Sequence, residues 1–567
     1  MADGTTKHER DESPAEKARE RIAGYRNRLD ALKTERASWL AVWREIAQHQ
    51  RPRAFRENLT ETNKGTTKHE KVINSVPLDA QRTLAAGMMS GITSPSRPWF
   101  RLTLPDPKIN ELPAVKAWLA DAERILRDAM SKSNFYKGLH GVYSDLGPFG
   151  TSAMYVEEDE EDGLRTYNFP IGSYCLAAGP RGNIDTIFRE LSLTVSQLVR
   201  LFGVENCSTA VQGMHKGRNL DARIAVVQVI QPNADMELGR LGAGGMGWSS
   251  CWFESAGDKP LREAGYEEFP VMCPRWEVTG EDVYGFGPGW QAQGDCKALQ
   301  QLEKRGAQAA EKIVNPPMQV PASLKNSPVS LLPGAEIYVP ETSTGQVVRP
   351  AIEINPNAIT VFMSQKSEHE GRIKRSYFAD LWLMLSESDG QMTAREVIER
   401  REEKLLQLGT VLESLADELL DPVIARVLAI LFRRGLLPPP PREIQGMEMR
   451  VEYISIMAQA QKLLGTTGVE RLVSFVGGIA ALDPTVLDNL DIDEIINQYA
   501  NMLGVPPQSV RPKEVTAAIR KARATAQAQQ QQLMAQAEQA KTAKTLSQAD
   551  TEGNNALTMM QRGMGVA

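Results

Sequence analysis

The sequence predicts an α+β fold that is mainly α-helical. Three observations support this prediction. Apolar residues recur every three or four positions over long stretches near both ends, and alternating residues fill the middle. In addition, two long segments without internal proline flank a proline-rich insert that favours strands. Because 567 residues exceed what one core usually serves, we expect two to four structural units.

Composition excludes several classes of protein. The hydrophobic content of 42% and the charged content of 24% are those of an ordinary soluble protein. No stretch of about 18 apolar residues and no signal peptide occurs, so we expect a protein without a membrane role, made in a cytosol. The five cysteines lack a CxxC spacing, which argues against a zinc site or a disulfide framework. A net charge of −6 argues against a broad surface that grips nucleic acid, but not against a protein that lets DNA pass.

The N-terminal part begins with a charged segment, residues 1–20, that we expect to be a flexible tail. Residues 15–48 show helical apolar spacing with one skipped step at Arg36. Such a helix packs on its own body or forms a coiled-coil dimer, and the first is the simpler reading. Further helices are predicted over 75–91 and 114–130, with an extended segment at 97–102 between them.

The middle of the chain alternates like a sheet. Gly, Asn and Asp turns separate the candidate strands, and a helix is predicted over 195–202. Gly242 to Gly247 satisfy GxGxxG, but the residues that follow favour a strand, which indicates a hairpin loop and not a dinucleotide site. The strands are predicted at 152–156, 166–169, 174–177, 184–191, 225–230 and 251–254.

Little in the sequence points to catalysis. The acidic run from Glu157 to Asp162 could bind a divalent cation, but like charges between two strands more often form a solvated turn. No Walker-type phosphate loop occurs, and the six histidines are isolated. We therefore expect neither enzymatic activity nor a cofactor.

Two helices are predicted on either side of the insert. The first runs from Trp290 to Val314, about 37 Å, and ends at an Asn-Pro-Pro sequence. The second opens at Asn355, which can cap it, and runs to Leu385, about 45 Å. If they are antiparallel, they form a stalk with a small β-rich module, residues 315–354, at its tip.

The second stalk helix and the loop after it carry the candidate DNA contacts. Basic side chains could meet phosphates, although interspersed glutamates make salt bridges between subunits an equal possibility. The loop is acidic and would repel DNA if it faced it. The basic residues are Lys366, Arg372, Lys374 and Arg375, and the loop residues are Ser386, Glu387, Ser388, Asp389, Gly390 and Gln391.

The C-terminal third is predicted to be helical. A capping box at Thr393 to Glu396 opens a long helix that ends at Arg434, and Pro422 must kink or restart it. Residues 447–534 favour helices with glycine and proline breaks. An Ala/Gln-rich helix and a flexible tail occupy residues 521–567.

Five short motifs, in this order, resemble one family. They are SGITSPSRPWFRL at 90–102, YGFGP at 284–288, NPP at 315–317, MTAREV at 392–397 and DPVIAR at 421–426. Together they resemble the head-tail connector, or portal, proteins of podovirus-type bacteriophages, over residues 39–507. One departure is Phe286, where the family often has Arg, so the ionic contact of that Arg is not expected here.

The resemblance implies a portal fold: a homo-oligomeric ring, typically of twelve subunits, around a DNA channel at a capsid vertex. It implies a wing (21–284), stem helices (285–314 and 355–385), a clip (315–354), a channel loop (386–392), a wing-to-crown helix (393–434) and a helical crown (435–520). The candidate clip interface comprises Met318, Val320, Leu324, Lys325, Ile337, Tyr338, Val339, Val347 and Arg349.

The resemblance also implies partners and a location. Double-stranded DNA would pass through the channel, while the terminase large subunit and later tail adaptor or nozzle proteins would dock on the clip. Major capsid and scaffolding proteins would surround the ring, in the virion and, during assembly, in the host cytoplasm. Sparse or negative charge would keep a sliding polyanion from being trapped. Two alternatives stay open: a metal-dependent nucleic-acid-processing enzyme that uses the acidic run, and a tail or baseplate component.

Overall fold

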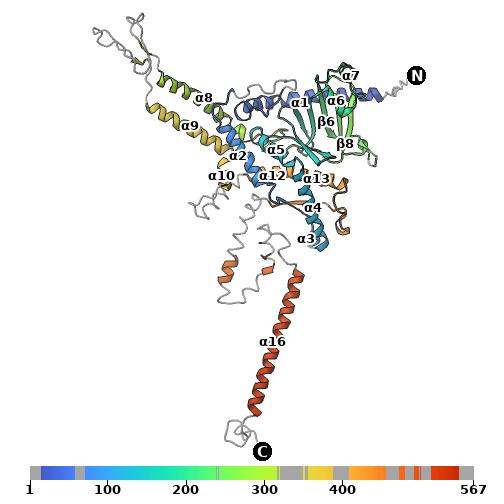
Figure 1. Ribbon diagram of the computed structural model, residues 1–567, viewed down its shortest axis with the longest axis vertical. Coiled ribbons are helices and arrows are strands. Elements are labelled where there is room, and N and C mark those ends of the chain that lie inside the picture. The colour runs from blue at the N-terminus through green and yellow to red at the C-terminus, as the bar shows by residue number, and fades with distance from the viewer. Residues whose placement is uncertain are drawn as a thin grey trace, which may run out of the picture. The chain divides into compact units, whose positions relative to one another are not determined.

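The computed structural model divides the chain into two compact units, residues 1–461 and 462–567. Helices dominate, and the strands gather in the middle of the first unit, so the predicted α+β, mainly α class is confirmed (Figure 1). The structure describes residues 14–57, 70–110, 112–237, 239–240, 242–315, 318–319, 349–350, 356–386, 408–447, 449–454, 472–478, 491–493, 495–496, 499 and 513–547.

The N-terminal helices lie where their apolar spacing predicts them. They are α1 (Pro14–Gln50), α2 (Val76–Gly91) and α4 (Pro113–Lys132), with the short α3 (Pro107–Asn110) before α4. A further helix, α5 (Phe135–Phe149), is not predicted by the sequence, because it contains three glycines and Pro148. Burial of most of its side chains among α2 and the neighbouring strands overrides that weak propensity.

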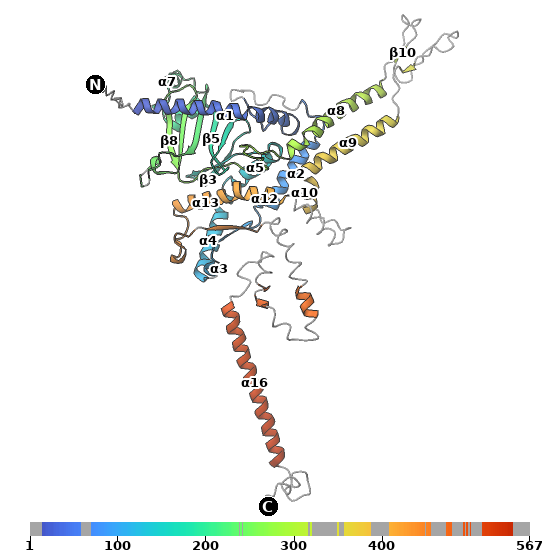
Figure 2. The ribbon, with the colours of Figure 1, turned by 180° about the vertical axis from the view of Figure 1, so that it is seen from behind.

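A five-stranded antiparallel sheet follows, and α1 covers one of its faces (Figure 2). Ile22 and Leu29 of α1 pack there against Phe188, Val227 and Phe253. Arg36, the skipped apolar step, is buried and donates to the carbonyl oxygens of Gly172 and Tyr174. The strands, in sheet order, are β4 (Tyr174–Ala178), β5 (Ile184–Thr194), β6 (Arg223–Pro232), β7 (Trp248–Glu254) and β8 (Pro260–Tyr266).

Two helices lie between β5 and β6, of which only the first is predicted by the sequence. That helix, α6 (Val195–Phe202), carries the capping box of Thr194 and Gln197. The second, α7 (Thr209–Lys216), is missed because only one of its residues, Val211, is buried. The GxGxxG sequence joins β6 to β7 through the short η1 (Ala243–Gly245), which confirms a hairpin loop.

A smaller sheet holds the acidic run. Its strands are β3 (Gly163–Asn168), β2 (Met154–Asp159) and β9 (Val271–Met272), in that order. The first half of the acidic run belongs to β2, so only its second half forms the predicted turn. The Arg434 guanidinium donates to the backbone oxygens of Asp159 and Glu160. Among the described residues, no three His, Cys, Asp or Glu side chains are grouped to hold a metal ion.

The expectation that residues 447–534 are all helical is wrong at β12 (Arg450–Tyr453). This strand pairs antiparallel with β1 (Phe100–Thr103). Val451 and Tyr453 alternate with polar residues, and both pack against the main core. A four-residue alternation is too short to stand out within a region that otherwise has helical spacing. The Ala/Gln-rich helix, α16 (Lys513–Ser547), begins before the predicted boundary at 521.

The helices after the sheets are α8 (Pro288–Val314), α9 (Pro356–Ser376) and α10 (Ala379–Ser386). The single second rod predicted to reach Leu385 is therefore wrong. Phe378 adopts a left-handed backbone with a φ of 53°, which no α-helix accommodates. Burial of Tyr377 and stacking of Phe378 on Trp276 hold the break.

The long C-terminal helix is described from residue 408 onward. It comprises α12 (Gly409–Leu415), a π-helical turn (Ala416–Leu420) and α13 (Asp421–Arg433). The π turn ends two residues before Pro422, whose missing amide cannot continue the ordinary ladder, and α13 begins at Asp421. Of the predicted kink or restart, the structure shows a restart. Glu418 of the π turn is partly buried and forms an ion pair with the buried Arg275. Among the residues that the structure describes, no helix has the length and apolar character that crossing a bilayer needs.

Candidate functional site

The base of α8 is packed backbone against backbone. Its N-terminal glycines lie on the end of α5, and a Cβ on Gly287 would lie 2.7 Å from the carbonyl oxygen of Gly147. A Cβ on Gly289 would lie 2.4 Å from that of Pro148. The YGFGPG sequence is therefore required for close approach, because only glycine fits at these two positions. Phe286, at the family's Arg position, is half-buried, and its amide donates to Glu277 O at 2.9 Å.

A buried polar junction ties three helices together above this contact. Gln50, at the end of α1, donates to Gly289 O at 2.9 Å and to Gln293 Oε1 at 2.8 Å. The Tyr377 hydroxyl, at the end of α9, donates to Gln50 Oε1. Gln50 and Tyr377 are both completely buried. The junction therefore fixes the ends of α1, α8 and α9 relative to one another.

Beyond the junction, α8 and α9 lie side by side (Figure 1). Asp295 Oδ1 lies 2.8 Å from Nδ1 of His369, and Glu303 lies 2.5 Å from Nζ of Lys366. Farther out, Gly306 faces the Phe362 ring, which a Cβ there would approach to 2.4 Å. Successive contacts involve higher residue numbers on α8 and lower residue numbers on α9, so the two helices are antiparallel, as predicted.

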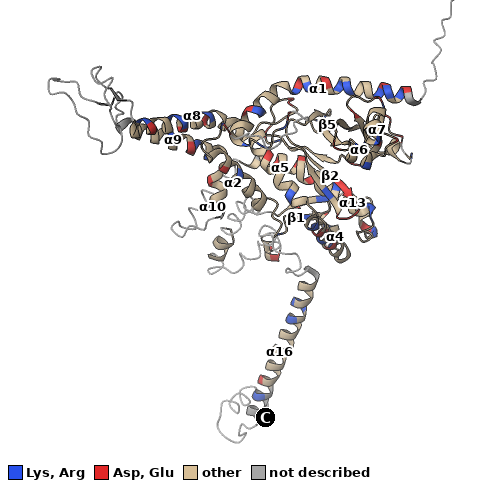
Figure 3. Cartoon of the chain, turned by 45° about the horizontal axis from the view of Figure 1, so that its top comes forward, with Lys and Arg blue, Asp and Glu red and all other residues tan. Residues whose placement is uncertain are grey.

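The four candidate basic residues of α9 fall into two groups. Lys366 and Arg372 are engaged within the chain, Lys366 with Glu303 and Arg372 with Glu368 and Asp295. Lys374 and Arg375 are exposed and form no ion pair in the described part of the chain. Both charge signs are interspersed along α8 and α9 (Figure 3). The helix pair is thus held by intrachain ion pairs, which the sequence reading did not anticipate.

The Glu303–Lys366 pair changes how both groups ionise. Partial burial raises the pKa of Glu303, but hydrogen bonds from Lys366 and Asn74 outweigh it and leave that pKa lowered. The hydrogen bond to Glu303 raises the pKa of Lys366. Asn74, in the loop before α2, donates to Glu303 at 2.7 Å and to Glu370 at 3.0 Å. Sequence reasoning missed Asn74, because nothing in its own segment signals contact with residues more than 220 positions away.

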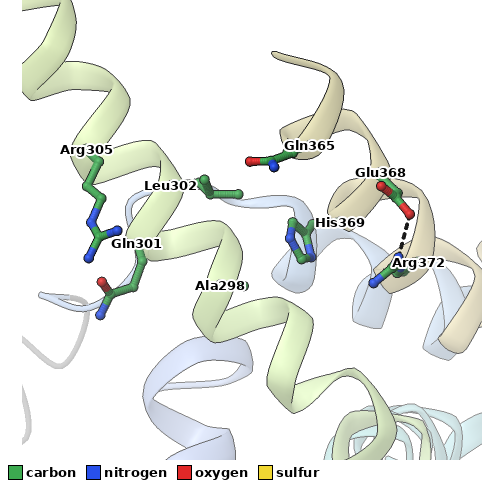
Figure 4. Close-up of a pocket in the computed structure, with 8 residues that line it drawn as sticks. All are labelled: Ala298, Gln301, Leu302, Arg305, Gln365, Glu368, His369 and Arg372. Carbon is green, nitrogen blue, oxygen red and sulfur yellow. Dashed lines mark hydrogen bonds and ion pairs between the residues drawn. The ribbon is translucent and has the colours of Figure 1, made fainter. Parts of the chain in front are cut away.

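One face of the helix pair carries a shallow groove of about 380 Å³. Charged side chains line it around the half-buried Leu302, and the Glu368–Arg372 ion pair closes one side (Figure 4). Toward the far ends of both helices, large apolar side chains are exposed. The groove is lined by Ala298, Gln301, Leu302, Arg305, Gln365, Glu368, His369 and Arg372, and the exposed apolar residues are Ile313, Val314, Ile359, Val361 and Met363.

Most predicted loop and tip residues lie outside the described part of the chain. Ser386 is the last residue of α10. Met318 and Arg349 lie in two-residue strands, β10 (Met318–Gln319) and β11 (Arg349–Pro350), which pair antiparallel. The residues outside the described ranges are Glu387, Ser388, Asp389, Gly390 and Gln391, and Val320, Leu324, Lys325, Ile337, Tyr338, Val339 and Val347.

Comparison with known proteins decides the family. A family model described as bacteriophage head to tail connecting protein matches residues 23–510. The chain belongs to this family. The resemblance that the sequence motifs predict is thereby confirmed, and it extends beyond residues 39–507.

Two curated relatives in this family are similar over almost their whole length. The portal protein of Salmonella phage epsilon15 is 44% identical over 97% of this chain and 99% of its own. The probable portal protein of Bordetella phage BPP-1 is 41% identical over 94% of this chain and 97% of its own.

Solved structures of gene transfer agent particles also match. A chain from the native virion gives a TM-score of 0.33 at 11% identity, and one from the neck of the empty particle gives 0.32 at 10%. Each match covers 76% of this chain and 91% of the other. Scores this low carry no inference about fold or function.

Proposed function

We propose that this chain is the portal subunit of a bacteriophage particle. Copies form a ring at one capsid vertex, double-stranded DNA passes through the ring during packaging and ejection, and the tail attaches to it. The observation that carries this proposal is the 44% identity to a portal protein with both chains covered almost end to end. A structural conduit needs no catalytic centre, so we assign no enzymatic activity.

The regions of the chain take portal roles on this proposal. Residues 21–284 form the wing, and 285–314 with 355–385 form the stem, its second helix broken at Phe378. Residues 315–354 form the clip, 386–392 the channel loop, 393–434 the wing-to-crown helix and 435–520 the crown. The packing of neighbouring copies sets the number of subunits in the ring. The family resemblance suggests twelve.

Partners follow from these roles. The clip docks the terminase large subunit during packaging and tail adaptor or nozzle proteins afterwards. Major capsid and scaffolding proteins contact the outside of the ring, which is assembled in the host cytoplasm and retained in the virion. Of the four basic residues on α9, Lys374 and Arg375 are the ones with charge available to DNA phosphates, since Lys366 and Arg372 are neutralised within the chain.

The α8–α9 pair supplies the surface between copies. Val361 and Met363 are 58% and 56% exposed on α9, and Val314 of α8 is 86% exposed. Large apolar side chains gathered at one end of a helix pair indicate a surface that another protein covers. A neighbouring copy is the occupant that a ring places beside this surface, because each stem contacts the next in a repeated head-to-tail interface.

Mass photometry and electron microscopy of the purified full-length protein test the proposal. We expect closed rings for the natural chain. The double variant Val361→Lys, Met363→Lys should lower the ring fraction at least about tenfold by placing charge in an apolar contact. Its thermal midpoint as a monomer should change little, because both side chains are already exposed.

Leu201→Lys is the matched control. Leu201 is an equally exposed apolar residue, 59%, at the end of α6. Rings should form normally in this variant. A stable monomer with no rings under any condition would refute the portal assignment itself. Normal rings in the double variant would leave that assignment intact and refute the interface on α9.

A further inference from the structure

The five-stranded sheet carries a polar row on the face opposite α1. Ile187 and Ile230 face each other across β5 and β6, as do Leu191 and Val226 farther along. These two apolar pairs belong to separate hydrophobic clusters, one beneath the β2–β3 hairpin and one beneath α6 and α7. Between them, cross-strand neighbours form a third row: Arg189, Gln228, Trp252 and Arg262.

Gln228 lies at the centre of this row without a partner. Its side chain is 1% exposed, and neither the amide nitrogen nor the amide oxygen forms a hydrogen bond. A buried amide that loses its hydrogen bonds to water and gains none in the protein destabilises a fold. A leucine would fill the same space between two apolar rows without that loss, so the amide requires an explanation.

Arg189 is the direct cross-strand neighbour of Gln228 and points to the same face. Its guanidinium lies over the Phe169 ring, 4.0 Å from the ring centre. It forms no hydrogen bond or ion pair with any residue that the structure describes. Burial lowers the pKa of Arg189 to about 10, because it outweighs the opposing electrostatic effect of Tyr155, Glu157 and Tyr167.

Two residues of β2, Tyr155 and Glu157, lie within electrostatic reach of Arg189. Tyr155 and Tyr266 share a hydrogen bond of 2.8 Å between their hydroxyls, and Tyr155 also stacks on Phe169. Glu157 interacts electrostatically with both Arg189 and Arg262. Burial raises its pKa and outweighs the hydrogen bond from Tyr155 and the two guanidinium groups, which lower it. Two guanidinium groups thus share one carboxylate, so positive charge and hydrogen-bond donors are in excess among these groups.

We propose that the row of Arg189, Gln228 and Arg262 binds a compact oxyanion, a phosphate or a carboxylate group. Arg189 would donate two parallel N–H bonds to the anion, the geometry that favours Arg for such groups. The Gln228 amide would donate a third, and its oxygen would accept from a protonated phosphate oxygen or a water. Arg262, exposed at the rim, would attract the anion on entry. The site requires no ring and no DNA, so it stands independently of the portal assignment.

Isothermal titration of the full-length protein with inorganic phosphate and, separately, with acetate tests this proposal. We expect saturable binding that weakens about tenfold or more in Arg189→Gln and in Gln228→Leu. Arg181→Gln is the matched control: Arg181 is an exposed cation in the turn before β5, and its loss should leave affinity unchanged. Saturation by phosphate alone identifies a phosphate site. Saturation by acetate as well identifies a site for an acidic side chain of a partner.

The thermal midpoint measured without any anion distinguishes a binding site from a purely structural row. Gln228→Leu should melt higher than the natural chain in chloride buffer, because the unpaired amide is gone, yet phosphate should raise its midpoint less than that of the natural chain. A lower midpoint in chloride would show that the amide has a partner within the chain and would overturn the proposal. So would the absence of saturable heat with both anions, or equal affinity in all four proteins.

Discussion

The inner and outer halves of the α8–α9 pair are held by opposite kinds of contact. At the inner end, Gly287 and Gly289 touch the backbone of α5, and Gln50 with Tyr377 closes a fully buried junction. At the outer end, ion pairs such as Glu303–Lys366 are partly exposed to water. Backbone contacts leave no room for adjustment. Exposed ion pairs stabilise little and can be exchanged.

This difference indicates a rigid anchor that carries an adjustable arm. A substitution at the anchor must displace backbone, while one on the arm only redirects flexible side chains. For a subunit whose far end contacts changing partners, as we propose, the division lets the tip vary without disturbing the body. Three substitutions, ordered by expected effect, can break or sharpen this comparison.

Gly289→Ala should have the largest effect. The added methyl group would lie 2.4 Å from Pro148 O and 2.8 Å from Gln50 Oε1, so backbone must move. We expect the free energy of unfolding to fall by about 3 kcal/mol or more, which is visible as a clear fall in the thermal midpoint.

Gly294→Ala is the matched control on the same helix, where a Cβ meets nothing within 4 Å. It should stabilise by about 0.5–1 kcal/mol, because alanine is the better helix former. Equal effects at both positions would contradict a tight anchor.

Tyr377→Phe should have an intermediate effect. The change keeps the ring in its buried place and removes only the hydroxyl that donates to Gln50. The Gln50 oxygen is then left without this donor in a dry site, which should destabilise by about 1–3 kcal/mol. Thermal unfolding of the variant measures this, and Gln50→Leu in the same background tests the coupling. If the two losses simply add, the junction does not act as a unit.

The sequence predicted the parts of this region that depend on local pattern and missed those that depend on distant contacts. The limits of α8 follow from Pro288 and the Asn-Pro-Pro stop, which are local signals. The break at Phe378 does not, because its left-handed backbone is held by the burial of Tyr377 and by stacking on Trp276, which is distant in the sequence. Likewise, α5 forms despite Pro148 because burial overrides propensity. The glycines of the YGFGPG sequence can be recognised from the sequence. The reason for them, contact with the backbone of α5, is visible only in the structure.

The candidate site divides in the same way. Lys366, Arg372, Lys374 and Arg375 stood out as cations within a predicted helix, which a sequence shows directly. Which of them keep a free charge depends on α8, because Asp295 and Glu303 neutralise the first two. No spacing rule connects residues on two helices separated by the 315–354 insert. The sequence therefore identifies the basic residues but does not show which of them form ion pairs within the chain.

Lys366→Met should have the smallest effect. Both members of the Glu303–Lys366 pair are between one fifth and one third exposed, so the free energy of unfolding of the variant should fall by less than about 1 kcal/mol at pH 7.

The folded state lowers the pKa of Glu303, so the stabilisation that Glu303 contributes is present above the ordinary carboxyl pKa and is lost as pH falls through the folded value. The folded state raises the pKa of Lys366, so that contribution is lost only in strong alkali. Once pH falls below the lowered pKa of Glu303, or at about 1 M salt, natural and variant chains should therefore melt together. Lys374→Met, which removes an exposed lysine that no described residue pairs with, should leave the midpoint unchanged at every pH. A loss at Lys366 as large as that at Gly289, or one insensitive to acid and salt, would mean that the outer half is as rigidly fixed as the anchor.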